Sequence, residues 1–301
     1  MKFLEAVTPD ALRERVREIA AARPAIQSAL DHVSPEGLAE WIQTQAPTYD
    51  ALRHLLPPAP PLNLRSITGP PDVPEFLRRG AEDINYMFEL HDAHAPPRAG
   101  KLRVLDFGCG CGRLSRFVGM SDSLEAFGSD ANPNHVDWCT VNLQGVVTRR
   151  NGFMPPLQFD AGSMDFVYAL SVFTHLPRDA AAAWFRDLAR VLAPRGILII
   201  TTHGYPALAT ITASQVHQDM FQLSQQDAIS LAERLPREEY IFIPYAAEVV
   251  KLANVGAIYG NTFMDVSRVH PLWDDVFELI EHVPGGLSKD WQDALVLRKR
   301  D

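Results

Sequence analysis

The chain has 301 residues, of which 47% are hydrophobic and 22% are charged, so a globular protein with a sizeable core is possible. Its formal net charge of −9 disfavours a general electrostatic attraction to phosphate backbones, and nucleic acid is not expected as a partner. The N-terminus lacks the apolar core of a signal peptide, no apolar run approaches the roughly 20 residues of a membrane span, and three cysteines cannot form a disulfide framework, so we expect a cytoplasmic protein with no membrane association.

The first 96 residues are predicted to form a helical region. A pattern of apolar residues at helical spacing ends at Pro24, and a second helix is expected to begin at Ser34-Pro35. The proline-rich residues 57–61 are interpreted as a stiff linker, and a further helix is predicted over about 75–91.

From Lys101 the pattern changes to short apolar strands that alternate with helices, as in an α/β sheet. The expected strands are 102–107, 124–130, 146–149, 165–170 and 196–202, with helices over 113–120 and 178–193. Residues 205–270 fit no simple βα rhythm, although Ser224 with Asp227 should begin a helix and 240–243 could be a short strand. Strands at 277–283 and 294–298, around the turn residues 284–286, are too close for a crossover and should pair antiparallel.

The sharpest motif is the glycine-rich turn after the first strand. Gly108, Gly110 and Gly112 alternate there, which allows a tight turn and lets a ligand touch bare backbone at a helix N-terminus. Asp130 ends the next strand, where a carboxylate can accept both ribose hydroxyls of an adenosine.

Two details bear on which adenosine ligand fits. The spacing Gly-x-Gly-x-Gly differs from the usual dinucleotide fingerprint Gly-x-Gly-x-x-Gly. Asp106 lies two residues before the first glycine, where it would repel a pyrophosphate but could reach an ammonium group. An ordinary strand and turn with structural glycines remains an alternative.

At these residues the sequence resembles the class I S-adenosylmethionine-dependent methyltransferases. The resemblance covers 101–202 strongly and 259–300 more loosely. It implies a Rossmann-like, doubly wound seven-stranded sheet with an antiparallel terminal strand, preceded by the N-terminal helical region (1–96). The domain that binds S-adenosyl-L-methionine would then be 97–301, with an α-rich lid insertion at about 205–270.

The resemblance also implies roles for individual residues. Asp106 and the glycines match the family's first motif, Asp130 matches the ribose ligand with Ala131 beneath the adenine, and Asn151 and Gly152 lie beside that base. Gly152 could equally serve only its own turn, and the third strand is poorly marked. The cofactor-binding residues implied are Asp106, Gly108, Cys109, Gly110, Arg113, Asp130, Ala131, Asn151, Gly152 and Leu170.

Candidates for catalysis should follow the carboxyl ends of the strands. His203 ends the fifth strand and could be a base or contact the substrate, or be a hydrogen-bonded turn residue. His175 follows the fourth strand, where a structural or cofactor-side role is favoured over catalysis, and Tyr259 could line a substrate pocket or pack under the sheet. Cys109 and Cys111 make a poor zinc site, so no metal is expected and we assign them to packing around the turn.

The first functional prediction is therefore methyl transfer from S-adenosyl-L-methionine to a small molecule through an O, N or C acceptor. A non-methylating enzyme that cyclises the cofactor or transfers its aminocarboxypropyl arm is the runner-up. A nicotinamide dehydrogenase and an inactive binding protein are further alternatives. The sequence identifies neither the acceptor nor the oligomeric state.

Overall fold

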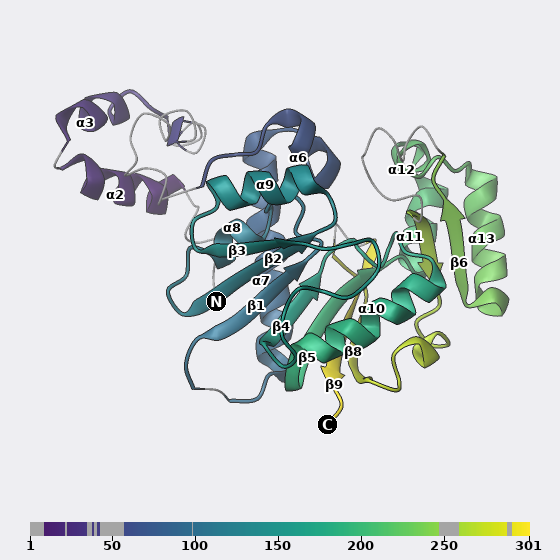
Figure 1. The fold of residues 1–301 in the computed structure, drawn as a ribbon. Coiled ribbons are helices and arrows are strands. Elements are labelled where there is room, and N and C mark those ends of the chain that lie inside the picture. The colour runs from purple at the N-terminus through teal and green to yellow at the C-terminus, as the bar shows by residue number, and fades with distance from the viewer. Residues whose placement is uncertain are drawn as a thin grey trace.

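The computed structural model describes residues 9–21, 23–34, 38, 41–42, 57–97, 99–246, 259–287 and 291–301. Its centre is one seven-stranded sheet with the order β3-β2-β1-β4-β5-β9-β8 (Figure 1). The strands are β1 (Leu102–Phe107), β2 (Leu124–Asp130), β3 (Val146–Arg150), β4 (Met164–Ala169), β5 (Leu192–Thr202), β8 (Phe277–Leu287) and β9 (Gln292–Lys299). The first five are parallel, whereas β9 is antiparallel to both neighbours. The predicted doubly wound sheet with an antiparallel terminal strand is confirmed.

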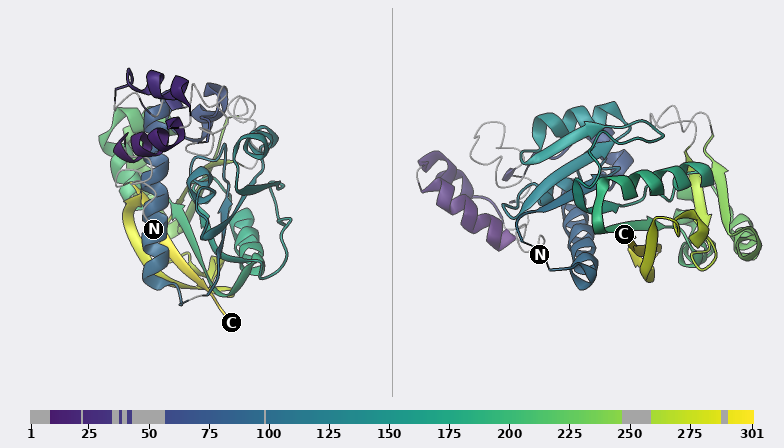
Figure 2. Two further views of the ribbon diagram at one scale, coloured as in Figure 1. Left: turned by 90° about the vertical axis from the view of Figure 1, so that its left-hand side faces the viewer. Right: turned by 60° about the horizontal axis from the view of Figure 1, so that its bottom comes forward.

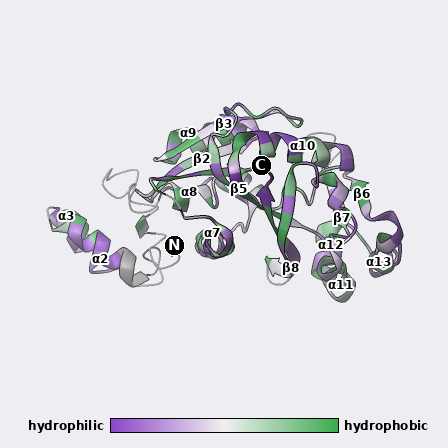
Figure 3. Ribbon diagram, turned by 90° about the horizontal axis from the view of Figure 1, so that it is seen from below, coloured by the Kyte–Doolittle hydropathy of each residue, from purple (hydrophilic) through white to green (hydrophobic). Residues whose placement is uncertain are grey.

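Helices cover both faces of the sheet because the strands alternate their side chains between two apolar cores. Val104 and Phe166 face a core shared with α7 (Val73–His94), α8 (Ser115–Val118) and α9 (Pro133–Asn142). Leu105 and Val167 face a second core shared with α10 (Arg178–Val191) and the 3₁₀ helix η1 (His270–Leu272). Figure 3 shows α7 and α10 on opposite sides of the sheet.

The N-terminal region is helical, as predicted, but its boundaries differ. The first pattern ends at Ala20 with α2 (Pro9–Ala20), and Pro24 then begins α3 (Pro24–Leu30), a helix that the sequence did not predict. Proline suits the first turn of a helix because its missing N–H has no intrahelical partner there. The predicted start of the next helix at Pro35 lies outside the described residues. α2 and α3 lie apart from the sheet (Figure 2).

The next two helices reach the sheet. α6 (Leu62–Thr68) follows the proline-rich residues, and α7 begins at Val73, two residues earlier than predicted, after Asp72 caps the Glu75 N–H at 2.9 Å. Phe76, Phe88 and other residues of α7 are buried in the same core as β1 and β4. α7 therefore forms part of the hydrophobic core of the sheet.

The insertion after β5 contains three helices and a second sheet. The helices are α11 (Tyr205–Ala213), α12 (Gln215–Phe221) and α13 (Gln225–Glu238). Ser224 and Asp227 form the predicted capping box of α13. The predicted strand at 240–243 is β6 (Tyr240–Pro244), which pairs antiparallel with β7 (Gly260–Met264), a strand that the sequence did not predict. This small sheet places residues 259–264 beside the main sheet.

Two sequence predictions need correction. The helix expected over 113–120 is only the short α8, because the chain between Gly110 and Leu114 makes turns. The terminal hairpin does not reverse at 284–286: β8 runs on to Leu287, which pairs with Gln292, and a register shift between Val283 and Leu287 accommodates these residues. A bulge of this kind tolerates proline and glycine inside a strand.

No helix among the described residues combines the length and apolar character that crossing a membrane would require.

Candidate cofactor site

The glycine-rich turn leaves β1 in a conformation that ordinary residues avoid. Gly108, Gly110 and Gly112 have φ angles of +78°, +53° and +73°, all in the left-handed region. The N–H groups of Gly108 and Cys109 both donate to the carbonyl of Ser129, at 2.7 and 3.0 Å. The turn is therefore attached to the carboxyl end of β2.

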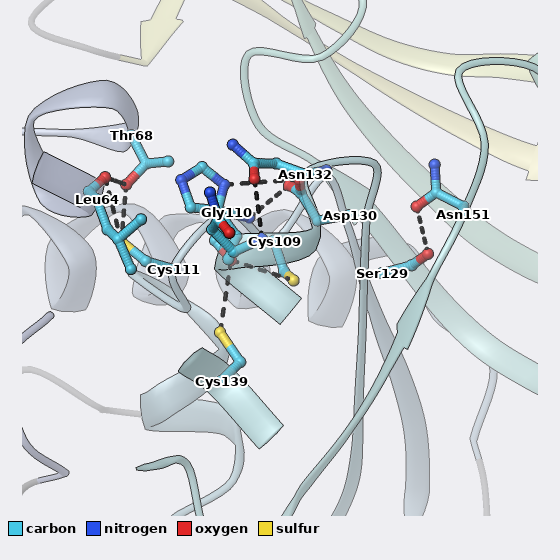
Figure 4. Close-up of polar contacts among 12 residues, drawn as sticks. Leu64, Thr68, Cys109, Gly110, Cys111, Ser129, Asp130, Asn132, Cys139 and Asn151 are labelled. Atoms are coloured by element: carbon cyan, nitrogen blue, oxygen red, sulfur yellow. Dashed lines mark hydrogen bonds and ion pairs between the residues drawn. The ribbon is translucent and has the colours of Figure 1, made fainter. Parts of the chain in front are cut away.

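Asp130 joins the end of β2 to this turn (Figure 4). Its Oδ2 accepts the Gly110 N–H at 2.8 Å, and its Oδ1 accepts the Asn132 N–H at 2.7 Å. The side chain is still 15% exposed. Because each carboxylate oxygen has two lone pairs, both oxygens retain the capacity to accept one more donor.

A cleft lies over the carboxyl ends of β1 and β2. Six of the residues predicted from the sequence line it together: Gly108, Asp130, Ala131, Asn151, Gly152 and Tyr259. Its other walls are Phe107, Phe153, Val172, Leu176 and Trp184. A cleft with one carboxylate, one amide and several aromatic rings is suited to a planar base attached to a polyol.

The sequence did not assign these aromatic walls to the site. Trp184 lies on the buried face of α10, and its ring packs on Phe107, with centroids 4.7 Å apart. Its indole N–H also donates to the carbonyl of Phe153 at 3.2 Å, so it supports the loop after β3. Periodicity within α10 identified the buried face but gave no information about which loop reaches it.

Asn151 is held in place by a residue that the sequence also missed. The Ser129 hydroxyl donates to Asn151 Oδ1 at 2.6 Å, and the Asn151 amide donates to the carbonyl of Gly152 at 2.7 Å. The Asn151 backbone N–H donates to the carbonyl of Asp130 at 3.1 Å. These bonds fix the loop after β3 next to the acidic residue of β2.

Other predicted cofactor residues surround the cleft without lining it. The Arg113 guanidinium pairs with Asp83 of α7 and donates from Nε to the carbonyl of Thr68 at 3.2 Å. Cys109 is buried, and its Sγ lies 3.6 Å from the carbonyl oxygen of Gly110. Leu170 packs against the core that β1 shares with α7. These three side chains contact other parts of the protein, and their roles toward a cofactor remain predictions.

Asp106 is buried on the same side of the sheet as α8. The Ser115 hydroxyl donates to its Oδ2 at 2.5 Å, and burial raises the pKa of Asp106 to about 6. A carboxylate removed from water in this way is stabilised by a nearby cation. An ammonium group brought by a ligand would provide one.

The N-terminal helix α6 lies directly on the glycine-rich turn. The Thr68 hydroxyl lies 2.9 Å from Cys111 Sγ, and a Cβ added at Gly110 would approach Thr68 Cγ2 to 2.5 Å. Cys109, Cys111 and Cys139 are all buried and free. Within the ranges described, no three residues of metal-binding type gather at one point. The cysteines are placed as packing groups around the turn.

Residues 104–196 match a family model described as a methyltransferase domain. A curated relative, 2-methyl-6-phytyl-1,4-hydroquinone methyltransferase from Synechocystis sp., is 28% identical over 133 residues. That match covers 44% of this chain and 41% of the relative, so it spans less than half the length of the curated relative. The chain therefore contains a methyltransferase domain over residues 104–196.

Solved structures of similar proteins include one from Pyrococcus horikoshii OT3, which is 15% identical, with a TM-score of 0.48 over 73% of this chain and 90% of that one. An S-adenosylmethionine-dependent methyltransferase from Mesorhizobium loti is 13% identical, with a TM-score of 0.45 over 71% of this chain and 97% of that one.

The cofactor of this methyltransferase family is S-adenosyl-L-methionine, and the residues at the turn fit its parts. The partly exposed carboxylate of Asp130 fits the ribose, and the aromatic walls fit the adenine. Asp106, a buried carboxylate with a raised pKa, fits the ammonium of the methionyl arm. The individual assignments of these residues remain predictions.

The two predicted catalytic histidines lie beyond the cleft, under the insertion. His175 stacks on Tyr259 with ring centroids 6.1 Å apart, and Tyr259 lines the cleft. His203 is 1% exposed, and its ring centroid lies 6.3 Å from that of His175. Burial lowers the pKa of His175, and it lowers the pKa of His203 well below its usual range. Both rings are therefore neutral at pH 7.

Carbonyl groups of β7 bear on the tautomer of these two neutral rings. His175 Nδ1 lies 2.9 Å from the carbonyl oxygen of Gly260, and His203 Nδ1 lies 3.2 Å from that of Thr262. Because a carbonyl only accepts, these contacts favour a proton on Nδ1 and a lone pair on Nε2 in each ring. The Tyr245 hydroxyl also lies 2.9 Å from His175 Nδ1 and can accept the same proton. His203 Nε2 has no hydrogen-bond partner in the described part of the chain, so its lone pair is not used there. Both rings thus have the form that a proton acceptor needs.

Proposed function

We propose that this protein transfers the methyl group of S-adenosyl-L-methionine to a small molecule. The observation that carries the proposal is the cleft in which Asp130, tied to the glycine-rich turn, meets Asn151 and aromatic walls. Methyl transfer from a sulfonium requires an aligned nucleophile more than it requires a catalytic group. A rigid turn and an acceptor pocket beside it would suffice.

The acceptor pocket is proposed to lie between the insertion over 205–270 and the sheet. This insertion follows β5 directly, so it begins at the carboxyl edge where ligands of open α/β sheets bind. Connections over a rigid sheet commonly determine substrate specificity. The net charge of −9 and the hydroquinone substrate in the name of the Synechocystis relative support a small molecule over a nucleic acid.

His175 and His203 are the proposed proton acceptors for a substrate whose nucleophilic atom carries a proton. The ring of His175 stacks on Tyr259, which lines the cleft. A neutral imidazole with a free Nε2 can remove a proton as the methyl group arrives. Tyr259 is the proposed wall between the cofactor and the acceptor. The cytoplasmic location and the boundary at residue 96 remain predictions.

The test is to identify the product that the cofactor leaves. The protein is incubated with methyl-labelled S-adenosyl-L-methionine and pooled phenols, amines and carboxylic acids, with the Asp130→Ala variant as control. Label in an acceptor together with S-adenosylhomocysteine supports the proposal. Methylthioadenosine instead would show transfer of the aminocarboxypropyl arm, and neither product under any pool would favour a binding protein.

A further inference from the structure

One face of helix α9 lies beneath the glycine-rich turn and the acidic residue of β2. α9 begins at Pro133, three residues after Asp130, and buries His135, Val136 and Cys139. Cys139 Sγ donates to the carbonyl of Gly110 at 3.4 Å. His135 lies one helical turn before Cys139, on the same face. This face therefore contacts the turn with one residue and can contact Asp130 with the other.

His135 is placed against Asp130 and has no other use in the described part of the chain. It is 3% exposed, and its Nδ1 lies 3.6 Å from Asp130 Oδ1. Neither ring nitrogen has a hydrogen-bond partner among the described residues. A buried polar group without a partner is unfavourable and rare in native proteins, whereas a leucine would fill a similar volume without that penalty. The imidazole at this position therefore needs an explanation that involves its nitrogens.

We propose that His135 is a positioning residue for Asp130 and thereby for recognition of the cofactor ribose. A shift of about half an ångström brings Nδ1 within hydrogen-bond distance of Oδ1. Asp130 would then be oriented by three N–H donors, from Gly110, Asn132 and His135, and one lone pair on Oδ2 would remain for a ribose hydroxyl. The inference rests on the proposed cofactor assignment, since the role of His135 depends on Asp130 binding the ribose.

The physical reason for a third donor is the change that ligand binding imposes on Asp130. The carboxylate is partly exposed without ligand, and a ribose placed on it would remove the remaining water. A hydrogen bond to a charged group is stronger where water is excluded. The N–H of His135 therefore stabilises the Asp130 carboxylate more once the ribose has displaced its water. His135 does not need to touch the ligand to have this effect.

The test measures how strongly the protein prefers a ligand with ribose hydroxyls. Calorimetry compares S-adenosylhomocysteine with its 2′,3′-dideoxy analogue on the wild-type chain, His135→Leu and His135→Gln. We expect His135→Leu to weaken S-adenosylhomocysteine by about tenfold, the value of one hydrogen bond, and to leave the dideoxy analogue unchanged. His135→Gln keeps an N–H donor and should recover part of the preference.

A matched control is His91→Leu. His91 is also a buried histidine, 5% exposed, and its ring lies 4.4 Å from that of Phe166, near the opposite edge of the sheet from Asp130. This substitution should leave the preference for the hydroxylated ligand unchanged. Equal losses for both ligands in His135→Leu, or no loss, would overturn the inference.

A second measurement does not depend on a substitution. Long-range ¹H–¹⁵N spectra of the wild-type chain bound to S-adenosylhomocysteine report which nitrogen of His135 carries the proton. The proposal requires a proton on Nδ1, and a bare Nδ1 facing the carboxylate would overturn it. If the wild-type chain binds S-adenosylhomocysteine and His135→Leu keeps the same preference for it over the dideoxy analogue, only this inference is refuted. If the wild-type chain binds neither ligand, the cofactor assignment itself is refuted.

Discussion

Two aspartates at the ends of neighbouring strands occupy different environments. Asp130 is partly exposed and accepts two backbone N–H groups, so its carboxylate remains available to hydroxyl donors. Asp106 is 4% exposed, with one hydroxyl donor and a raised pKa. The sequence places both residues near the turn. Their difference in burial suits the first to a ribose and the second to a cation.

Replacing Asp130 by alanine should weaken binding of S-adenosylhomocysteine by about 1.5–3 kcal/mol, because a charged acceptor of hydrogen bonds is lost. Calorimetry measures this loss. The melting temperature should also fall, since the Gly110 and Asn132 N–H groups lose their acceptor. The control is Asp137→Ala, which replaces an exposed aspartate on α9 and should leave binding of S-adenosylhomocysteine unchanged. Unchanged affinity in Asp130→Ala would show that the ribose lies elsewhere.

Asp106 should make the free energy of unfolding depend on pH. Its folded pKa of about 6 is above the ordinary value of 3.8 for an aspartate, so between these values the folded chain binds more protons than the unfolded chain. This residue's contribution to stability therefore falls as pH rises from about 4 to about 6, and is constant above that range.

Denaturant titrations of the wild-type chain and Asp106→Asn at several pH values isolate this contribution as a difference. The subtraction matters because His203, whose pKa burial lowers, contributes the opposite slope below its unfolded pKa. We expect Asp106→Asn to gain stability relative to wild type as pH rises to 6, and to bind S-adenosylmethionine more weakly. A constant difference between the two proteins would contradict the buried state of Asp106.

Among the elements of the fold, the glycine-rich turn lies against neighbouring segments of the protein and also lines the cleft. The sequence explains Gly108 and Gly110 by close approach of the cofactor to the backbone. In the structure, a Cβ at Gly108 would also approach Val172 Cγ2 to 2.3 Å, and one at Gly110 would approach Thr68 Cγ2 to 2.5 Å. A bulky substitution at Gly108 or Gly110 would therefore destabilise the fold, and a loss of cofactor binding could not be attributed to the cofactor contact alone.

A double-mutant cycle separates these causes for Gly110. Gly110→Ala should lower the free energy of unfolding by about 1–3 kcal/mol, through overpacking against Thr68 and the left-handed φ. Thr68→Ser removes the methyl group and keeps the hydroxyl that contacts Cys111. In the double variant part of the loss should disappear, while the backbone strain remains. Additive effects in denaturant titrations would show that α6 does not constrain the turn.

In the whole molecule, residues of the N-terminal region from 57 onward pack against the main sheet and α8. Arg116 of α8 is fully buried and donates to the carbonyls of Pro57 and Pro58 at 3.2 and 3.3 Å. It also lies 5.2 Å from the ring centre of Phe76 in α7. A cut at residue 96 would therefore remove partners of α8 as well as one side of the core.

Truncation at two positions tests this arrangement. A chain that begins at residue 57 should stay soluble and bind S-adenosylhomocysteine, because it retains α6, α7 and the partners of Arg116. A chain that begins at residue 97 should aggregate, since it exposes the surface that α7 covers. Solubility, the melting temperature and calorimetry provide the comparison. Normal binding by the shorter chain would show that the domain begins after α7.

Features that depend on local spacing can be predicted without knowledge of the fold. Strand, turn and strand around Gly108 and Asp130 could be predicted because the hydrophobic period, the glycines and the acidic residue lie within 30 residues of one another. The capping box at Ser224 was predicted for the same reason. The resemblance to a known family extended these local signals to the order of the sheet.

Contacts between residues that are distant in the chain could not be predicted in this way. Trp184, Tyr259 and Gly108 line one cleft although their positions in the chain give no sign of it. Thr68 reaches the glycine-rich turn from a helix that the sequence treats as part of another region. The tautomers of His175 and His203 depend on carbonyl groups of β7, a strand that pairs with β6. Contacts of this kind depend on packing between elements, for which local propensity and periodicity carry no information.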